Sequence, residues 1–303
     1  MDLTRRITTT RRHQLRSGVL GLLVVATGLG VAGPGNASGT PNASAPCAVT
    51  SVVPTWKHVI WIIMENRSFS QIIGSSNAPY VNSLATRCGL ATNYRAVAHP
   101  SLPNYLAMVS GSTQGVTDDK PPSSHQLKGP SIFSQLGTGW TSLEESMPSK
   151  CALASSGTYA VKHNPVAYFT TIRTACAARD IPLASMPDMS ARFTFVTPNL
   201  CNDMHDCSVQ AGDKWLATFI PKILNSSTYS IGSTAVLLTW DENDGSSSNQ
   251  VATVVISPTV AQGARSSTAF THYSMLRTTE EMLRLPLLGN AASATSMRSA
   301  FRL

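Results

Sequence analysis

Four nearly continuous apolar runs constrain the fold of this chain more than any other feature. They cover residues 57–64, 192–197, 235–240 and 251–257. A strand that is apolar at almost every position is buried on both faces, which is typical of a parallel sheet covered by helices. Helix-like stretches separate the runs, at residues 79–87, 103–110, 130–136, 165–178, 211–225 and 271–285. This alternation predicts a three-layer α/β/α sandwich with a mostly parallel central sheet.

The composition is compatible with one large folded domain. Of the 303 residues, 42% are hydrophobic and 13% are charged, which excludes disorder on composition and allows a large core. The sequence contains neither an internal repeat nor a strong boundary after residue 50. We therefore expect a single domain over residues 46–303.

The first 45 residues have the order of an export signal. A basic stretch ends at Arg16, an apolar stretch covers residues 19–26, and a tract rich in small residues runs from 30 to 46. This order predicts a signal peptide and low-complexity leader over residues 1–45, and the apolar stretch is too short to span a bilayer comfortably. Arg11-Arg12 resembles a twin-arginine signal, so the general secretory and twin-arginine routes both remain open. We expect a secreted protein without a membrane span.

The net charge argues against a nucleic-acid partner. The formal charge is +7, of which five arginines and one aspartate in residues 1–45 contribute +4, leaving +3 for the remainder. That excess is not gathered into a basic run with interleaved aromatic residues. We expect no nucleic-acid binding, although a modest positive excess helps to attract anionic substrates.

The cysteines predict disulfide bonds. All six follow the leader, and an even count in an exported chain is typical of disulfides. Cys201 and Cys207 form the easiest local pair, and two further bonds, Cys47–Cys88 and Cys151–Cys176, would complete one of many pairings. A zinc site is the alternative, and the absence of any CxxC pair in the sequence disfavours it.

Polar clusters follow three of the apolar runs. Glu65-Asn66 follows the first, residues 199–206 follow the second, and Asp241-Glu242 follows the third. Ligands of open α/β sheets bind beyond the carboxyl ends of the strands, so these clusters should meet in space. Carboxylate and amide oxygens are ligands for hard cations, and adjacent carboxylates at an apolar strand end are costly unless solvated or paired. The alternative interpretation is a set of ordinary polar turns.

Ser101-Leu102-Pro103-Asn104 predicts the start of a helix. Serine is a favoured N-cap, and proline is favoured in the first turn. A helix N-terminus with free N–H groups also suits a phosphate, in which case Ser101 could be a nucleophile and Asn104 could contact a phosphoryl oxygen. A capped helix without further function is the alternative.

Histidines supply two further candidates. His205 lies between Cys201 and Cys207, close to Asp203, and imidazole can bind a metal ion or protonate a leaving group. His272 opens the last predicted helix and is either a ligand, a phosphate donor or a neighbour of the helix cap.

These motifs, in this order, resemble those of the phosphoesterase family of the alkaline phosphatase superfamily. That family includes bacterial acid phosphatases and phospholipases C, and the likeness is greatest to small secreted actinobacterial acid phosphatases named phosphatidylinositol-3-phosphatases. The resemblance covers nearly all of residues 50–303, and Glu65-Asn66-Arg67-Ser68-Phe69 is its most specific part. Ser101-Leu102-Pro103-Asn104 is similar to the Thr-Phe-Pro-Asn nucleophile motif of nucleotide pyrophosphatases. Glu242 departs from the Asp-His pair of those enzymes, which suggests a harder cation than zinc or a single metal.

The resemblance implies a metal-dependent phosphomonoesterase with a phosphoserine intermediate on Ser101 and His205 or His99 as the acid. One or two divalent ions are implied, and the substrate would be a small phosphate ester or a phosphoinositide headgroup bound by a monomer. A phosphodiesterase or phospholipase C on the same scaffold, and a non-catalytic secreted metal-containing binding protein, remain alternatives. By resemblance, the first metal site comprises Glu65, Asn66, Ser101, Asp241 and Glu242. A second metal site, or a set of phosphate and leaving-group contacts, comprises Asn199, Asp203, His205 and His272.

Overall fold

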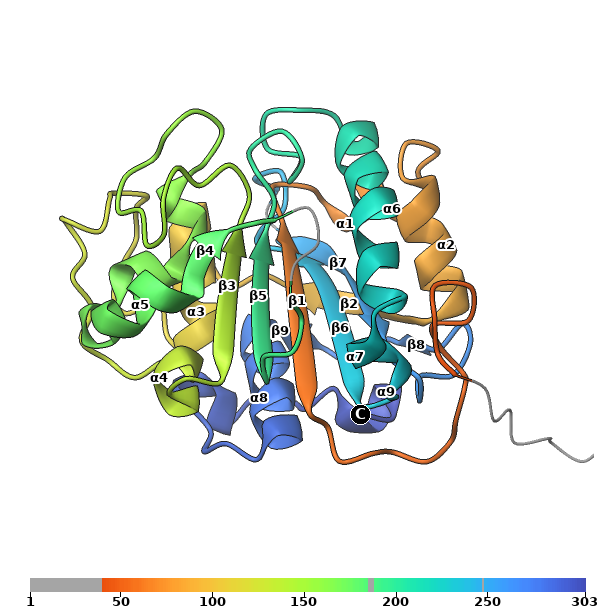
Figure 1. The fold of residues 1–303 in the computed structure, drawn as a ribbon. Helices are drawn as coiled ribbons and strands as arrows, with labels where there is room; N and C mark the ends of the chain where they lie inside the picture. Colours follow the sequence, from red (N-terminus) through yellow and green to blue (C-terminus); the bar gives the residue numbers. More distant parts are fainter. Residues whose placement is uncertain (1–39, 185–187, 247) are drawn as a thin grey trace, which may run out of the picture. The chain divides into compact units, whose positions relative to one another are not determined.

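A nine-stranded sheet organises the computed structural model, which describes residues 40–184, 188–246 and 248–303 (Figure 1). The strands lie in the order β4-β3-β5-β1-β6-β7-β2-β8, and β9 pairs with β2. Their bounds are β1 His58–Met64, β2 Gly89–Arg95, β3 Trp140–Glu144, β4 Asp180–Pro182, β5 Phe193–Thr197, β6 Thr234–Trp240, β7 Gln250–Ile256, β8 Arg265–Ser266 and β9 Phe270–Thr271.

The sheet confirms the predicted mostly parallel α/β class. β4, β3, β5, β1 and β6 pair in parallel, and only the pairings of β7 with β6 and with β2 are antiparallel. β6 is buried at every residue, and β1 at every residue after His58. Burial on both faces explains why these strands are apolar throughout. The sequence did not reveal β2 and β3, since their polar residues break the apolar run.

Helices cover both faces of the sheet (Figure 1). One face carries α1 Phe69–Ile72, α2 Pro79–Arg87, α6 Val209–Leu224 and α7 Ser227–Ser230. The other carries α3 Ser101–Ser110, α4 Ile132–Leu136, α8 His272–Leu283 and the terminal α9 Arg298–Phe301. A 3₁₀ turn, η4 Gly289–Ala292, contacts α8. The three-layer prediction is therefore confirmed.

The prediction of one continuous helix over residues 165–178 is wrong. Residues 165–178 form two 3₁₀ turns, η2 Pro165–Tyr168 and η3 Thr170–Ile172, followed by α5 Arg173–Arg179. The backbone of Phe169 is extended, with ψ near 105°, and this interrupts the helix. A further turn, η1 Val161–His163, precedes them and carries residues of the site.

Three disulfides form in the one pairing that the sequence had suggested, among many possible. They join Cys47 to Cys88, Cys151 to Cys176 and Cys201 to Cys207. Because all six thiols are consumed, the described structure has no cysteine available for zinc.

The predicted leader falls largely outside the described residues, which begin at Thr40. Its last residues contact the sheet-bearing unit: the N–H of Ala43 donates to Asn225 Oδ1 at 3.1 Å, and Arg87 donates to the carbonyl of Ala43 at 3.1 Å. Among the described helices, none combines the length and the apolarity that crossing a bilayer requires.

Candidate active site

The strand register brings the predicted polar clusters together. Met64 and Trp240 are paired at the ends of β1 and β6, so Glu65 and Asp241 emerge side by side. The N–H of Glu65 donates to the carbonyl of Asp203 at 2.8 Å, which joins the loop after β5 to the same edge. The carboxyl ends of three strands therefore supply one site, as the sequence predicted.

Ser101 lies within this carboxylate cluster. Its Oγ donates to Glu65 Oε2 at 3.0 Å and lies 3.4 Å from Glu242 Oε1, and the side chain is 1% exposed. Ser101 is the first residue of α3 rather than its cap, which is Pro100. The sequence predicted free N–H groups at the start of this helix. One of them is already occupied, because Leu102 donates its N–H to Asp119 Oδ1 at 2.9 Å.

His99 and Asn104 lie near Oε2 of Glu242, the carboxylate oxygen that Ser101 does not contact. His99 Nδ1 is 2.6 Å from Glu242 Oε2, and its side chain is 40% exposed. Asn104 Nδ2 lies 3.5 Å from the same oxygen. The Oδ1 of Asn104 accepts the N–H groups of Val97 and Ala98 at 3.0 and 2.9 Å, which fixes the loop that leads to Ser101.

Two aromatic residues of the site were missed from the sequence. Tyr105 donates its hydroxyl to Glu65 Oε1 at 2.6 Å and stacks on His163, with ring centroids 5.3 Å apart. His163 Nε2 is 3.2 Å from Glu65 Oε1, and its Nδ1 is 3.4 Å from Asp203 Oδ2. A His before Asn164-Pro165 in a loop-like segment was the only local signal, and such turns are common.

Burial governs the electrostatics of the cluster. The pKa values of Glu65 and Asp241 are raised well above their usual ranges, first by burial and then by neighbouring carboxylates. Burial also raises the pKa values of Asp203 and Glu242 to about 7. The pKa of His163 is lowered, first by burial and then by Lys162, which favours a neutral imidazole.

Unpaired polar atoms in the cluster fit a divalent cation. His163 Nε2, Asp203 Oδ2 and Asp241 Oδ2 are buried and make no hydrogen bond with the described residues. The distances of 3.2 and 3.4 Å given above for the first two atoms are therefore close contacts without hydrogen-bond geometry. Ligand atoms of Glu65, His163 and His205 lie within 4.8 Å of one another. Buried polar atoms are rarely left unpaired, and carboxylate oxygens with imidazole nitrogens suit zinc and related ions. The residues present therefore fit a divalent ion.

Three residues predicted for the site, Asn66, Asn199 and His272, make hydrogen bonds within the protein. Asn66 has a positive φ of 52° and donates its N–H to Asp241 Oδ1 at 3.1 Å. Asn199 Oδ1 accepts the N–H groups of the two residues after Leu200, at 3.1 and 3.0 Å, and so shapes the loop. His272 is fully buried; its ring nitrogens contact Tyr94 Oη at 3.1 Å and the Asp241 carbonyl at 2.5 Å. His272 therefore helps to hold the backbone of Asp241 in place.

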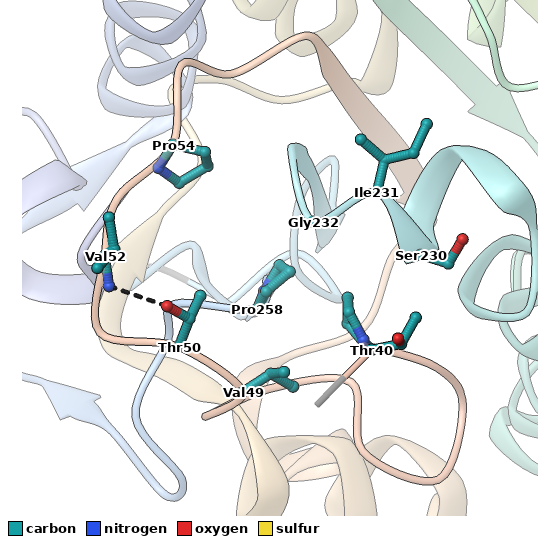
Figure 2. Close-up of a pocket in the computed structure, with 10 residues that line it drawn as sticks. Thr40, Val49, Thr50, Val52, Pro54, Ser230, Ile231, Gly232 and Pro258 are labelled. Carbon is teal, nitrogen blue, oxygen red and sulfur yellow. Dashed lines mark hydrogen bonds between the residues drawn. The ribbon is translucent and has the colours of Figure 1, made fainter. Parts of the chain in front are cut away.

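A separate cavity has a volume of about 530 Å³. Figure 2 shows the residues that line it. Pro54 precedes β1, Ile231 precedes β6 and Pro258 follows β7, so this cavity is at the amino end of the parallel strands. None of its lining residues is titratable. The cavity lacks the chemistry of the cluster at the opposite edge.

Comparison of the sequence with known proteins gives one family. A model of the phosphoesterase family matches residues 75–286. A phosphatidylinositol-3-phosphatase of Mycobacterium tuberculosis is 36% identical over 253 residues, covering 80% of this chain and 82% of that protein. An acid phosphatase of Aspergillus fumigatus is 31% identical over 76% of this chain, and a probable acid phosphatase of Kluyveromyces lactis is 29% identical over 77%. The chain spans 55% and 60% of the lengths of these two fungal enzymes.

Solved structures agree on the fold. A Vibrio parahaemolyticus protein of the alkaline phosphatase superfamily has a TM-score of 0.55 at 13% identity, with 83% of this chain and 73% of that chain covered. A lipoteichoic acid synthase from Listeria monocytogenes has a TM-score of 0.56 at 11% identity, with 79% and 76% covered. At such low identities the likeness concerns the fold alone.

Proposed function

The chain belongs to the phosphoesterase family and hydrolyses phosphoric ester bonds; from that premise we propose that it is a secreted, metal-dependent phosphomonoesterase whose nucleophile is Ser101. The contact of the buried Ser101 hydroxyl with Glu65, at 3.0 Å, carries this proposal. A serine hydroxyl needs a neighbouring base or cation to become a nucleophile, and this one contacts the carboxyl groups of Glu65 and Glu242.

A divalent ion would be held by Glu65, Asp241 and Glu242, with His163 and His205 beside them. When bound, it supplies positive charge that favours the serine alkoxide and the charged phosphoryl oxygens. The proposed ligand region also includes Asp203 and Asn66. Asn66 directly follows Glu65 in the sequence. Neutralisation of these carboxyls by a cation also removes the cost of burying them together.

The residues of the chain then divide the proton transfers. Glu65 and Glu242 both lie within reach of the Ser101 hydroxyl, and one of them accepts its single proton and returns it to Ser101 when the phosphoserine is hydrolysed. His99 is half-exposed, bound to Glu242 and close to Ser101 in sequence, so it protonates the departing alkoxide and later activates the water that hydrolyses the phosphoserine. His205, whose Nδ1 is 2.7 Å from Asp206 Oδ1, is the alternative acid.

The substrate class, the extracellular location and the monomeric state are part of the same proposal. The relationship to the Mycobacterium tuberculosis enzyme, which spans most of both chains, supports a phosphoinositide headgroup or another small phosphomonoester. The three disulfides support an extracellular location. We propose that the mature protein is a monomer that begins after the leader.

The test is hydrolysis of p-nitrophenyl phosphate and of bis-p-nitrophenyl phosphate by the purified protein, with and without a chelator. Ser101→Ala should abolish turnover, while Ser110→Ala, a buried serine at the far end of the same helix, should retain it. Preference for the diester would replace the phosphomonoesterase by a phosphodiesterase. Absence of turnover of both esters, with a range of divalent ions supplied, would favour a binding protein.

A further inference from the structure

An ion pair lies directly beside the nucleophile. Lys162 Nζ is 3.0 Å from Asp119 Oδ2, and Asp119 Oδ1 accepts the N–H of Leu102 at 2.9 Å. Leu102 follows Ser101 on α3, and Lys162 precedes His163 on η1. Asp119 thus ties the start of the nucleophile helix to the turn that carries His163.

Lys162 directly precedes His163, whose imidazole lies 3.2 Å from Glu65 Oε1 and 3.4 Å from Asp203 Oδ2. The charge of Lys162 lowers the pKa values of Glu65, Asp203 and Glu242 against the larger effect of burial. The ammonium group pairs with the Asp119 carboxylate at 3.0 Å, so Lys162 carries its positive charge at the start of α3. With 22% of its side chain exposed, Lys162 is also reachable by solvent and solutes.

Arg67, which follows Asn66 in the sequence, is a further cation and is engaged elsewhere. Arg67 donates to the carbonyls of Met204 and Cys207 at 2.7 and 3.0 Å, which fixes the disulfide-closed loop. Lys162, by contrast, has three N–H donors, and within the described part of the chain Asp119 accepts one of them. An ammonium with donors to spare, beside a serine nucleophile, can contact an incoming dianion.

Building on the function proposed above, we propose that Lys162 binds the phosphoryl oxygens of the substrate and that Asp119 is the positioning residue that holds it beside Ser101. The substrate class is a phosphomonoester, and inorganic phosphate, the product, binds through the same contact. Hydrogen bonds between charged groups are strong, and their loss without replacement weakens binding markedly.

Binding of inorganic phosphate tests this role without requiring turnover. In Lys162→Met, the KM and the inhibition constant of phosphate should rise about tenfold or more, equivalent to about 1.4 kcal/mol or more. Phosphate should also raise the melting temperature of the wild type but not of Lys162→Met, with the bound metal content unchanged. Lys162→Arg should recover part of the affinity. Lys120→Met is the matched control, since Lys120 pairs with Asp118 at 3.0 Å and is 66% exposed, and it should behave as wild type.

A double-mutant cycle tests Asp119. If Asp119 acts through Lys162, Asp119→Asn should raise KM in the wild type but add little in the Lys162→Met background. Fully additive losses would show that Asp119 acts separately and would overturn the positioning role.

Acylation with an amine-selective reagent tests Lys162 without any substitution. Phosphate should protect Lys162 of the wild type from the reagent, as followed by mass spectrometry, and should leave Lys120 unprotected. Equal phosphate binding by wild type and Lys162→Met, or unprotected Lys162, overturns the proposal. An inactive wild type that still binds phosphate through Lys162 would instead refute the proposed phosphatase function.

Discussion

A buried pair of carboxyl groups next to the site should make the folded protein less stable as the pH rises. Asp180 begins β4 and Glu144 ends β3, and both are buried. Asp180 Oδ2 accepts a hydrogen bond from Asn164 at 2.9 Å, while its Oδ1 has no partner among the described residues. Burial raises the pKa of Asp180 to about 7, and burial followed by the charge of Asp180 raises that of Glu144.

The size and direction of the effect follow from the two protonation states. In the unfolded chain Asp180 has its usual pKa of 3.8, so between about pH 4 and pH 7 the folded protein holds a proton that the unfolded chain has released. The stabilisation is complete below about pH 4 and is lost as the pH rises through about 7. A pKa difference of this size corresponds to roughly 4 kcal/mol.

Asp180→Asn removes this dependence while keeping an oxygen to accept the hydrogen bond from Asn164. The free energy of unfolding of the variant should fall several kcal/mol less than that of wild type between about pH 4 and pH 8. Urea denaturation at steps of about one pH unit, with the disulfides intact, measures the difference. Asp188→Asn, an exposed aspartate on the segment leading to β5, is the matched control and should leave the slope unchanged. Equal slopes for wild type and Asp180→Asn would refute the reasoning. Buried acids away from Asp180 contribute alike to both proteins, and loss of the Asp180 charge, which raises the pKa of Glu144, can only add to the difference.

Three further predictions concern the site. Tyr105→Phe removes the hydroxyl that donates to Glu65, so the free energy of unfolding should fall by about 1.5–3 kcal/mol in urea, and an unchanged midpoint would contradict the contact. Replacing Cys201 and Cys207 together by serine should lower the stability by about 2 kcal/mol, from loop entropy, and should abolish activity because the loop positions candidate ligands; full activity would contradict the second part. A chelator should lower the melting temperature, since a bound cation compensates the buried carboxylates, and a temperature insensitive to both chelator and added divalent ions would argue against a metal.

The sequence by itself determined the class of fold and one edge of the site. Apolar character is a local property, so residues 57–64 and 235–240 could be recognised as doubly buried strands without knowledge of their partners. The rule that ligands bind beyond the carboxyl ends of parallel strands then brought Glu65 and Asp241 together. The nucleophile candidate, Ser101, followed from the helix-start pattern and the family resemblance.

Only the tertiary structure decided which other side chains join this edge. His163, Tyr105 and Lys162 come from a 3₁₀ turn and a helix interior, where no local periodicity marks a functional residue, and their roles depend on contacts with Glu65 and Asp119. The disulfide pairing was likewise fixed by which cysteines lie close in space. His272 is a further example. The sequence left its role open, and only its hydrogen bonds to Tyr94 and to the backbone carbonyl of Asp241, just after β6, place it in a supporting position. Side-chain partners are set by how distant segments pack, and that information is absent from any single stretch of sequence.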